Sequence, residues 1–174
     1  RMWCEEDGCY YNLKFDGTFS KRQSPDCFMP LMTGCVPKER KERLLQLLKD
    51  ENKFWGEYMI PSIAKDDPAF PQQHYWRGQI WPPQTLWTYL ALKRAGEEEL
   101  AWELACKAAG MLSKEWNRNG YCPENYSGIK GECSGAYHYN WGMLMGLPLL
   151  EELIEFREDK VIFGNAMAPD GTEL

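Results

Sequence analysis

The chain has 174 residues, which fits one folding domain or part of one. Its formal net charge is −6 and no stretch gathers Lys and Arg on one face, so binding to nucleic acid is excluded. The longest apolar segment, Trp141 to Leu153, is shorter than the roughly 20 residues that cross a bilayer, so we expect a soluble protein without membrane contact. Aromatic residues make up 14% of the chain, and this excess indicates either a bulky core or stacking surfaces in a binding cleft.

The first elements alternate between extended and helical patterns. Between Cys9 and Phe19, apolar residues alternate around Asp16-Gly17, which predicts a small β excursion near the N-terminus. After Pro37, leucines recur behind a charged face, which predicts an amphipathic helix over Lys38 to Lys49.

A long irregular segment follows, from Gly56 to Pro83, and it is rich in Pro, Gly and aromatic residues. Irregular segments longer than about 12 to 15 residues are uncommon in compact domains unless they are functional or disordered. This segment is too apolar for disorder, so we expect it to carry function. Its final Pro82-Pro83 opens a helix through Ala95, with Gly96 as its C-cap.

The second half of the chain repeats the same order. A helix is predicted over Glu97 to Arg118, because acids occupy its first turn and bases its last turn. A second aromatic loop, Tyr121 to Asn140, leads into a helix predicted from about Trp141 to Arg157. Each of the helices predicted over 38–49 and 97–118 is associated with a Trp, a Gly, a Tyr and a Pro in the same order, and then with a loop. This weak repeat favours a ring of helical hairpins over a bundle with short loops. We predict an all-α toroid whose site lies on the loops at one end.

Two loops carry candidate site residues. The first combines Tyr75, Trp76 and Trp81 with the polar residues Arg77, Gln79 and Gln84. A sugar needs this combination, because its C–H face packs on an aromatic ring while its hydroxyls need directional partners. Packing of these tryptophans between helices is an equally good interpretation of the residues alone. Four other tryptophans are expected to pack between helices: Trp55, Trp87, Trp102 and Trp116.

The second loop places Glu124 after a proline, beside Asn125 and Tyr126. A partly desolvated carboxylate with such neighbours is suited to be a general base, although a loop glutamate is more often a solvated surface residue.

Asp66 and Asp67 are adjacent acids that offer a third interpretation, a Mg²⁺ site of the kind used by helical toroids that handle diphosphates. Consecutive carboxylates in a Pro-containing loop are more often turn and cap residues. We therefore predict no metal site and no cofactor, and keep a Mg²⁺-dependent terpenoid-type toroid as an alternative.

Four motifs together resemble the C-terminal part of the catalytic domain of glycoside hydrolase family 63 and its trehalase-like relatives. They are Pro61 to Phe70, Tyr75 to Pro83, Glu124-Asn125-Tyr126 and Tyr139 to Gly142. The resemblance extends from about Tyr10 to about Phe163. It implies an (α/α)6 barrel that hydrolyses an α-glycosidic bond with inversion, as processing α-glucosidases and mannosylglycerate or glucosylglycerate hydrolases do.

The resemblance also implies roles for residues. Glu124 matches the general base of the family, and Trp141 matches the aromatic residue that follows the base loop. Including the neighbours of the base, the expected substrate-binding residues are Tyr75, Trp76, Arg77, Gly78, Gln79, Trp81, Asn125, Tyr126 and Trp141. The general acid of the family is an Asp on an earlier loop, expected upstream of Arg1.

Residues 1–174 are therefore expected to form a single unit, the C-terminal portion of a larger barrel. The expected partners are a carbohydrate substrate and either the remainder of the barrel or a second copy of the chain. A non-catalytic carbohydrate-binding or helical interaction module remains an alternative.

The 7 cysteines include no C-x-x-C pair and accompany only 2 histidines, so no zinc motif is matched and we expect reduced, mostly buried thiols. The absence of a basic-then-apolar signal segment after Arg1 predicts a cytoplasmic protein or a piece of a longer one.

Overall fold

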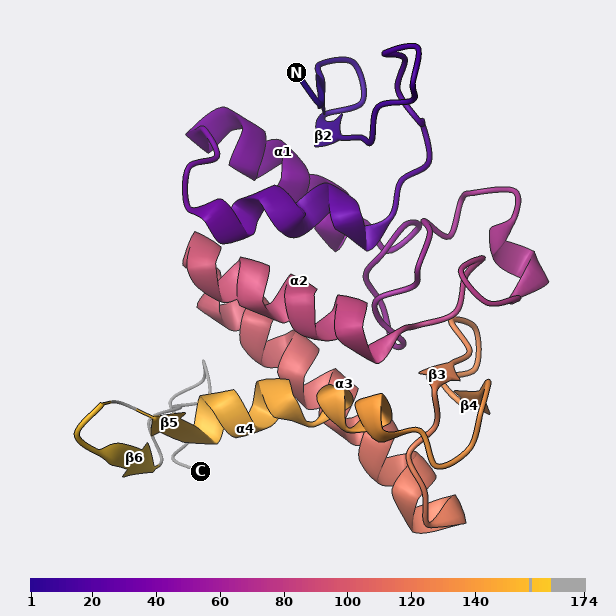
Figure 1. The fold of residues 1–174 in the computed structure, drawn as a ribbon, viewed down its shortest axis with the longest axis vertical. Coiled ribbons are helices and arrows are strands. Elements are labelled where there is room, and N and C mark those ends of the chain that lie inside the picture. The colour runs from indigo at the N-terminus through magenta and orange to yellow at the C-terminus, as the bar shows by residue number, and fades with distance from the viewer. Residues whose placement is uncertain (157, 164–174) are drawn as a thin grey trace.

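The structure, a computed structural model, describes residues 1–156 and 158–163 (Figure 1). The elements in chain order are β1 (Trp3–Cys4), β2 (Cys9–Tyr10), the 3-10 helix η1 (Pro25–Thr33), α1 (Lys38–Lys49), the 3-10 helix η2 (Phe70–Gln72), α2 (Pro82–Ala95), α3 (Glu98–Asn119), β3 (Asn125–Tyr126), β4 (Cys133–Ser134), the 3-10 helix η3 (Asn140–Met145), α4 (Leu147–Leu153), β5 (Ile154–Phe156) and β6 (Val161–Phe163). Among the described residues, the named strands form two-stranded antiparallel ladders, and β3 also bridges Ile80. The predicted all-α class is confirmed.

Three predicted helices lie within one residue of their expected bounds. α1 and α2 match the predicted ranges, and α3 begins and ends one residue later than predicted. Glycines end α2 and α3, because Gly96 (φ 75°) and Gly120 (φ 72°) adopt the left-handed conformation that terminates a helix.

The fourth predicted helix, Trp141 to Arg157, is wrong as a continuous element. The segment begins as the 3-10 helix η3, becomes α-helical only over Leu147–Leu153, and then forms strand β5. Pro148 lies in the first turn of α4, where it cannot donate a backbone hydrogen bond to a preceding turn, so the helix starts afresh there. Arg157 lies outside the described residues.

The N-terminal β structure is larger than the predicted excursion. The expected hairpin around Asp16-Gly17 is a single bridge, Leu13 to Phe19, and the nearby backbone N–H of Lys14 donates to Thr18 at 2.8 Å. The β1–β2 pair precedes it and was not predicted, because two residues a strand are too few for an alternating pattern.

Helical hairpins make up the body of the molecule (Figure 1). η1 packs against α1, and α2 packs against η1, α3 and α4. The ends at which α2 and α4 begin lie on the same side as the β3–β4 ladder, at the right in Figure 1. The aromatic loops are therefore gathered at one end of the helices, as predicted.

Two of these loops are joined by backbone hydrogen bonds. The amide of Ile80 donates to Tyr126 at 2.8 Å, and the amide of Tyr126 donates back to Ile80 at 3.0 Å. Ile80 also bridges Pro61, so the segment before α2 lies between two extended segments. This short ladder fixes the first aromatic loop against the loop that carries Glu124.

The exposure of the remaining tryptophans corrects part of the sequence prediction. Trp55 is buried as expected, but Trp87 is 46% exposed and Trp116 is 52% exposed. Both lie on helices, so these helices present apolar surface that no described residue covers. No helix within the described ranges has the length and apolar character that a membrane crossing requires.

Candidate functional site

A stacked pair of indoles occupies the entrance to α2. Trp81, the N-cap of α2, is fully buried, and its ring lies 4.0 Å from that of Trp76 between centroids, with the planes inclined by 15°. Tyr75 packs edge-on against Trp81 at 4.8 Å, and its carbonyl accepts the Trp81 indole N–H at 3.2 Å. Trp76 remains 43% exposed, so a rigid aromatic face is presented to solvent.

Gly78 lies where the first aromatic loop closely approaches the loop that carries Glu124. Its φ is 103°, and its amide donates to the buried Ser62 hydroxyl at 3.1 Å. A side chain on Gly128 of the second loop would collide with the Gly78 carbonyl oxygen. The side chain of Gln73 joins both loops, donating to Phe70 at 2.9 Å and accepting from the amide of Gly128 at 2.7 Å. Gly78, expected to bind substrate, therefore has a structural position between the loops.

Glu124 is half-buried, and both its side chain and its backbone form hydrogen bonds. Its carboxylate accepts the backbone N–H of Ala136 at 3.0 Å, and its own amide donates to Ala136 at 2.9 Å. The indole N–H of Trp141 donates to the Glu124 carbonyl at 3.0 Å. The Trp141 ring also packs edge-on against Trp81 at 5.8 Å between centroids. Trp141 therefore connects the loop of Glu124 to the stacked indoles.

Asn125 is fully buried next to Glu124. Neither polar atom of its side-chain amide has a hydrogen-bond partner among the described residues. A Cβ on Gly135 would lie 2.7 Å from Glu124 Oε2 and 2.8 Å from Asn125 Nδ2, so both side chains lie against this glycine. Both polar atoms of the Asn125 amide are also shielded from solvent.

Other predicted site residues have different surroundings. The Tyr126 hydroxyl is buried without a partner in the described part of the chain, and burial raises the pKa of this phenol. Gln79 is buried and its amide donates to Ser134 at 2.5 Å, so it links the loop before α2 to β4. Arg77 is exposed, with a guanidinium nitrogen 2.9 Å from His74 Nδ1.

The adjacent acids proposed for Mg²⁺ are both engaged with cations. Asp66 pairs with Lys53 at 2.7 Å, and Asp67 pairs with Arg22 at 2.9 Å. Asp67 also accepts the amide of Ala69 at 2.8 Å, as a turn residue does. These contacts match the turn-and-cap interpretation.

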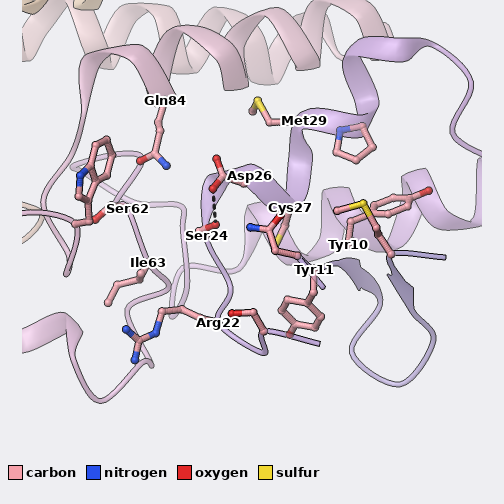
Figure 2. Close-up of a pocket in the computed structure, with 15 residues that line it drawn as sticks. Tyr10, Tyr11, Arg22, Ser24, Asp26, Cys27, Met29, Ser62, Ile63 and Gln84 are labelled. Atoms are coloured by element: carbon pink, nitrogen blue, oxygen red, sulfur yellow. Dashed lines mark hydrogen bonds between the residues drawn. The ribbon is translucent and has the colours of Figure 1, made fainter. Parts of the chain in front are cut away.

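A cavity of about 720 Å³ adjoins Trp76 (Figure 2). Its polar lining includes Asp26 and Ser24 at the start of η1, Ser62, and the buried Gln84 on α2. Sequence reasoning singled out Gln84 but missed Asp26, because an acid after Ser24-Pro25 has the pattern of an ordinary helix start.

All seven cysteines are free, and four of them, Cys4, Cys9, Cys27 and Cys122, are buried.

Helical hairpins with aromatic loops gathered at one end are the architecture of a part of an (α/α)6 barrel. The chain belongs to the mannosylglycerate hydrolase MGH1-like glycoside hydrolase domain family, whose model matches residues 1–142.

Relatives and solved structures agree with this assignment. The chain is 28% identical over 166 residues to the mannosyl-oligosaccharide glucosidase of Saccharomyces cerevisiae, covering 82% of this chain and 20% of the relative. It is 26% identical over 150 residues to the mannosylglycerate hydrolase of Thermus thermophilus, covering 84% of this chain and 34% of the relative. The crystal structure of a GH63 mannosylglycerate hydrolase from Thermus thermophilus in complex with glucose matches with a TM-score of 0.75 at 23% identity, covering 86% of this chain and 36% of that chain.

The chain thus spans 20% of the length of the first of these curated relatives and 34% of the second. The structural match shows the fold, a part of an (α/α)6 barrel.

Proposed function

We propose that residues 1–174 are the C-terminal portion of an (α/α)6 catalytic domain that hydrolyses an α-glycosidic bond with inversion, and that Glu124 is its general base. The observation that carries this proposal is the position of Glu124 and the contacts that hold it. Its half-buried carboxylate accepts from the Ala136 amide, and Trp141 joins its loop to the stacked indoles. A sugar packed on Trp76 would then lie on the same end of the helices as the base.

The reaction follows from this placement. The Glu124 carboxylate takes a proton from a water molecule as that water attacks the anomeric carbon, with help from the neighbouring Asn125 or Tyr126. An inverting enzyme also needs a carboxylic acid roughly 6.5 to 9.5 Å from the base, to protonate the leaving oxygen. The resemblance to the family implies that this acid is an Asp on an earlier loop, so we propose that it lies outside residues 1–174; Asp66 and Asp67 are paired with Lys53 and Arg22.

The substrate is proposed to be a carbohydrate with an α-linked terminal sugar. The named activities of the relatives, a mannosyl-oligosaccharide glucosidase and a mannosylglycerate hydrolase, support this class. The test is hydrolysis of alkyl α-glucosides and glucosylglycerate by the chain and by Glu124→Gln. We expect little turnover by either, because the proposed acid lies outside these residues. Turnover that disappears in Glu124→Gln would instead locate an acid within these residues.

Exposed apolar side chains on the helices support the proposal that a partner covers this surface. Trp87, Trp116, Met143 and Leu150 are each between 46% and 53% exposed, and apolar surface of this extent drives association. We propose that the remaining barrel helices cover it, and that the isolated chain self-associates through it. Light scattering tests this, and a monodisperse monomer would count against the partial barrel.

A non-catalytic carbohydrate-binding module is the second candidate. It is favoured by the Trp76–Trp81 stack, which can bind a sugar without any acid. This function predicts that Glu124→Ala binds glycans as the wild type does and that no substrate is turned over.

A further inference from the structure

Two buried cysteines from separate elements are in contact in the N-terminal part of the chain. Cys9 on β2 is fully buried, Cys27 on η1 is 2% exposed, and β2 packs against η1. A hydrogen bond joins the two thiols, so their sulfur atoms lie next to each other while both side chains are reduced. Neither thiol takes part in the proposed hydrolysis.

A contact between two thiols is the arrangement from which a disulfide forms. Thiols that are hydrogen-bonded need only a small approach of the side chains to reach the S–S bond length of about 2.0 Å. The buried Cys122 thiol, by contrast, lies 2.9 Å from the Met143 thioether, with which it cannot form such a bond. The placement of Cys9 and Cys27 therefore favours a covalent link between β2 and η1.

The groups around Cys9 favour its thiolate. The hydrogen bond with the Cys27 thiol lowers the pKa of Cys9 and raises the pKa of Cys27. The Tyr11 hydroxyl also donates to the Cys9 sulfur, and the Gln23 amide lies 4.0 Å from it. Because the thiolate is the nucleophile in thiol oxidation, Cys9 is the attacking group of the pair and Cys27 is the group that completes the disulfide.

The pair lies beside two cavities. Cys27 and Tyr11 line the cavity of about 720 Å³ (Figure 2), and Tyr11 and Gln23 line a second one of about 320 Å³. The β1–β2 ladder that carries Cys9 is two residues long, and short elements near a chain end open locally at low free energy. A small oxidant can therefore reach the pair more easily than a bulky one.

We propose that Cys9 and Cys27 are a redox-sensitive modification site, which a small peroxide converts to a disulfide between β2 and η1. With hydrogen peroxide, the Cys9 sulfur attacks one oxygen, the O–O bond breaks, and a sulfenic acid forms. The leaving hydroxide takes up the proton that the Cys9 thiol released, and becomes water. The Cys27 sulfur then attacks the Cys9 sulfur, the S–O bond breaks, and a second water leaves with the Cys27 proton. Two thiols are oxidised and one peroxide is reduced to two water molecules.

The disulfide joins the N-terminal segment to the first helix of the body. Tyr10 and Tyr11 line the larger cavity from the N-terminal segment, and Cys27 lines it from η1. Oxidation therefore fixes these two parts of the cavity wall to each other, and reduction releases them.

The test is peptide mapping by mass spectrometry after the full chain is treated with one equivalent of hydrogen peroxide. Trypsin places Cys9 and Cys27 in separate peptides, each with one further cysteine, Cys4 or Cys35. We expect a cross-link between these peptides, with loss of two hydrogen atoms, that dithiothreitol reverses. The same cross-link should form in a chain with Cys4→Ser and Cys35→Ser, where each peptide holds one thiol.

Matched variants show which thiols react. Cys9→Ser and Cys27→Ser should each abolish the cross-link. Cys122→Ser is the control, because Cys122 is buried but contacts a thioether, and it should leave the cross-link unchanged. Circular dichroism checks that each variant folds.

The wild type provides a second measurement that needs no variant. Because a disulfide restricts the unfolded chain, the oxidised chain should unfold at a temperature about 5 to 10 °C above that of the reduced chain. Peroxide added in urea should give a mixture of pairings, since the folded contact then no longer selects Cys27 as the partner of Cys9.

Four results would overturn the inference: no cross-link in the folded wild type, a cross-link that persists in Cys9→Ser or Cys27→Ser, an unchanged unfolding temperature in the cross-linked chain, or equally selective pairing in urea. The inference stands apart from the proposed hydrolysis, because Glu124→Gln leaves both thiols in place and should form the same cross-link.

Discussion

The indole rings of Trp76 and Trp81 are stacked, with centroids 4.0 Å apart and planes inclined by 15°. Trp81 is fully buried and Trp76 is 43% exposed, so a ring fixed in the core supports a ring that faces solvent. A platform held this way loses little conformational entropy when a sugar packs on it.

The two indoles should respond differently to truncation. Trp81→Ala removes a fully buried side chain and should lower the free energy of unfolding by about 3 to 5 kcal/mol. Trp76→Ala should cost only about 1 kcal/mol, the scale of one aromatic contact, but should abolish detectable sugar binding. Urea denaturation and calorimetric titration measure the two effects. Trp116→Ala is the control, because Trp116 is similarly exposed but does not stack on Trp81, and sugar binding that survives Trp76→Ala would refute the platform.

Gly135 should be required for the position of the Glu124 carboxylate. Gly135→Ala places a Cβ 2.7 Å from Glu124 Oε2 at a φ of 74°, so both backbone strain and displacement of the carboxylate are expected. Gly96→Ala is the matched control, because Gly96 has a φ of 75° and nothing within 4 Å of its Cβ position. Both variants should lose about 1 kcal/mol of stability from the left-handed conformation. Only Gly135→Ala should impair Glu124-dependent hydrolysis of a glycosyl fluoride, which needs no acid, and equal effects of the two variants would contradict the position described for the Glu124 carboxylate.

The contact between Tyr89 and Glu152 should stabilise the packing of α2 against α4. The Tyr89 hydroxyl donates to Glu152 at 2.7 Å, and Lys93 lies 3.1 Å from the same carboxylate oxygen. Tyr89→Phe should lower the free energy of unfolding by about 1 to 2 kcal/mol at pH 7, since the acceptor is charged. Tyr137→Phe, at an exposed position, should have no effect.

The same residue predicts a pH dependence. Burial, together with the hydrogen bond to Glu152, raises the pKa of Tyr89. The folded state therefore keeps the phenol proton when the unfolded state loses it, so this contribution is complete below pH about 10 and is lost as the pH rises above it. Urea denaturation at pH 7 and pH 10.5 should show a smaller loss of stability in Tyr89→Phe than in the wild type. An equal loss would show that Tyr89 does not carry the effect.

Local signals in the sequence predicted most of the helical framework. Gly96 and Gly120 end α2 and α3 as their residue type predicts, and Pro82 opens α2. The prediction of a continuous fourth helix was wrong because the apolar run after Trp141 fits several conformations, and a new helix starts within this run at Pro148. The predicted burial of Trp87 and Trp116 was wrong for a different reason. The periodicity of a sequence indicates which face of a helix is apolar, but not which residues cover that face.

The candidate site divides in the same way. Glu124 and the Trp76–Trp81 string were recognisable because each lies within one short motif. Asp26 was not, because the cavity joins residues from η1, α2 and the N-terminal segment, which are distant in sequence. Only the packing of these elements brings an ordinary first-turn acid to the same space as Gln84.

The assignment of Glu124 as the base is tested most directly with α-glucosyl and α-mannosyl fluoride. Fluoride leaves without protonation, so if Glu124 is the base and the acid lies outside residues 1–174, the chain should hydrolyse one of these fluorides while leaving alkyl glycosides nearly untouched. We predict release of the β-anomer, seen by proton NMR, and a loss of about 10² to 10⁴-fold in Glu124→Gln. Fluoride hydrolysis at the wild-type rate in Glu124→Gln, or initial release of the α-anomer, would contradict this assignment.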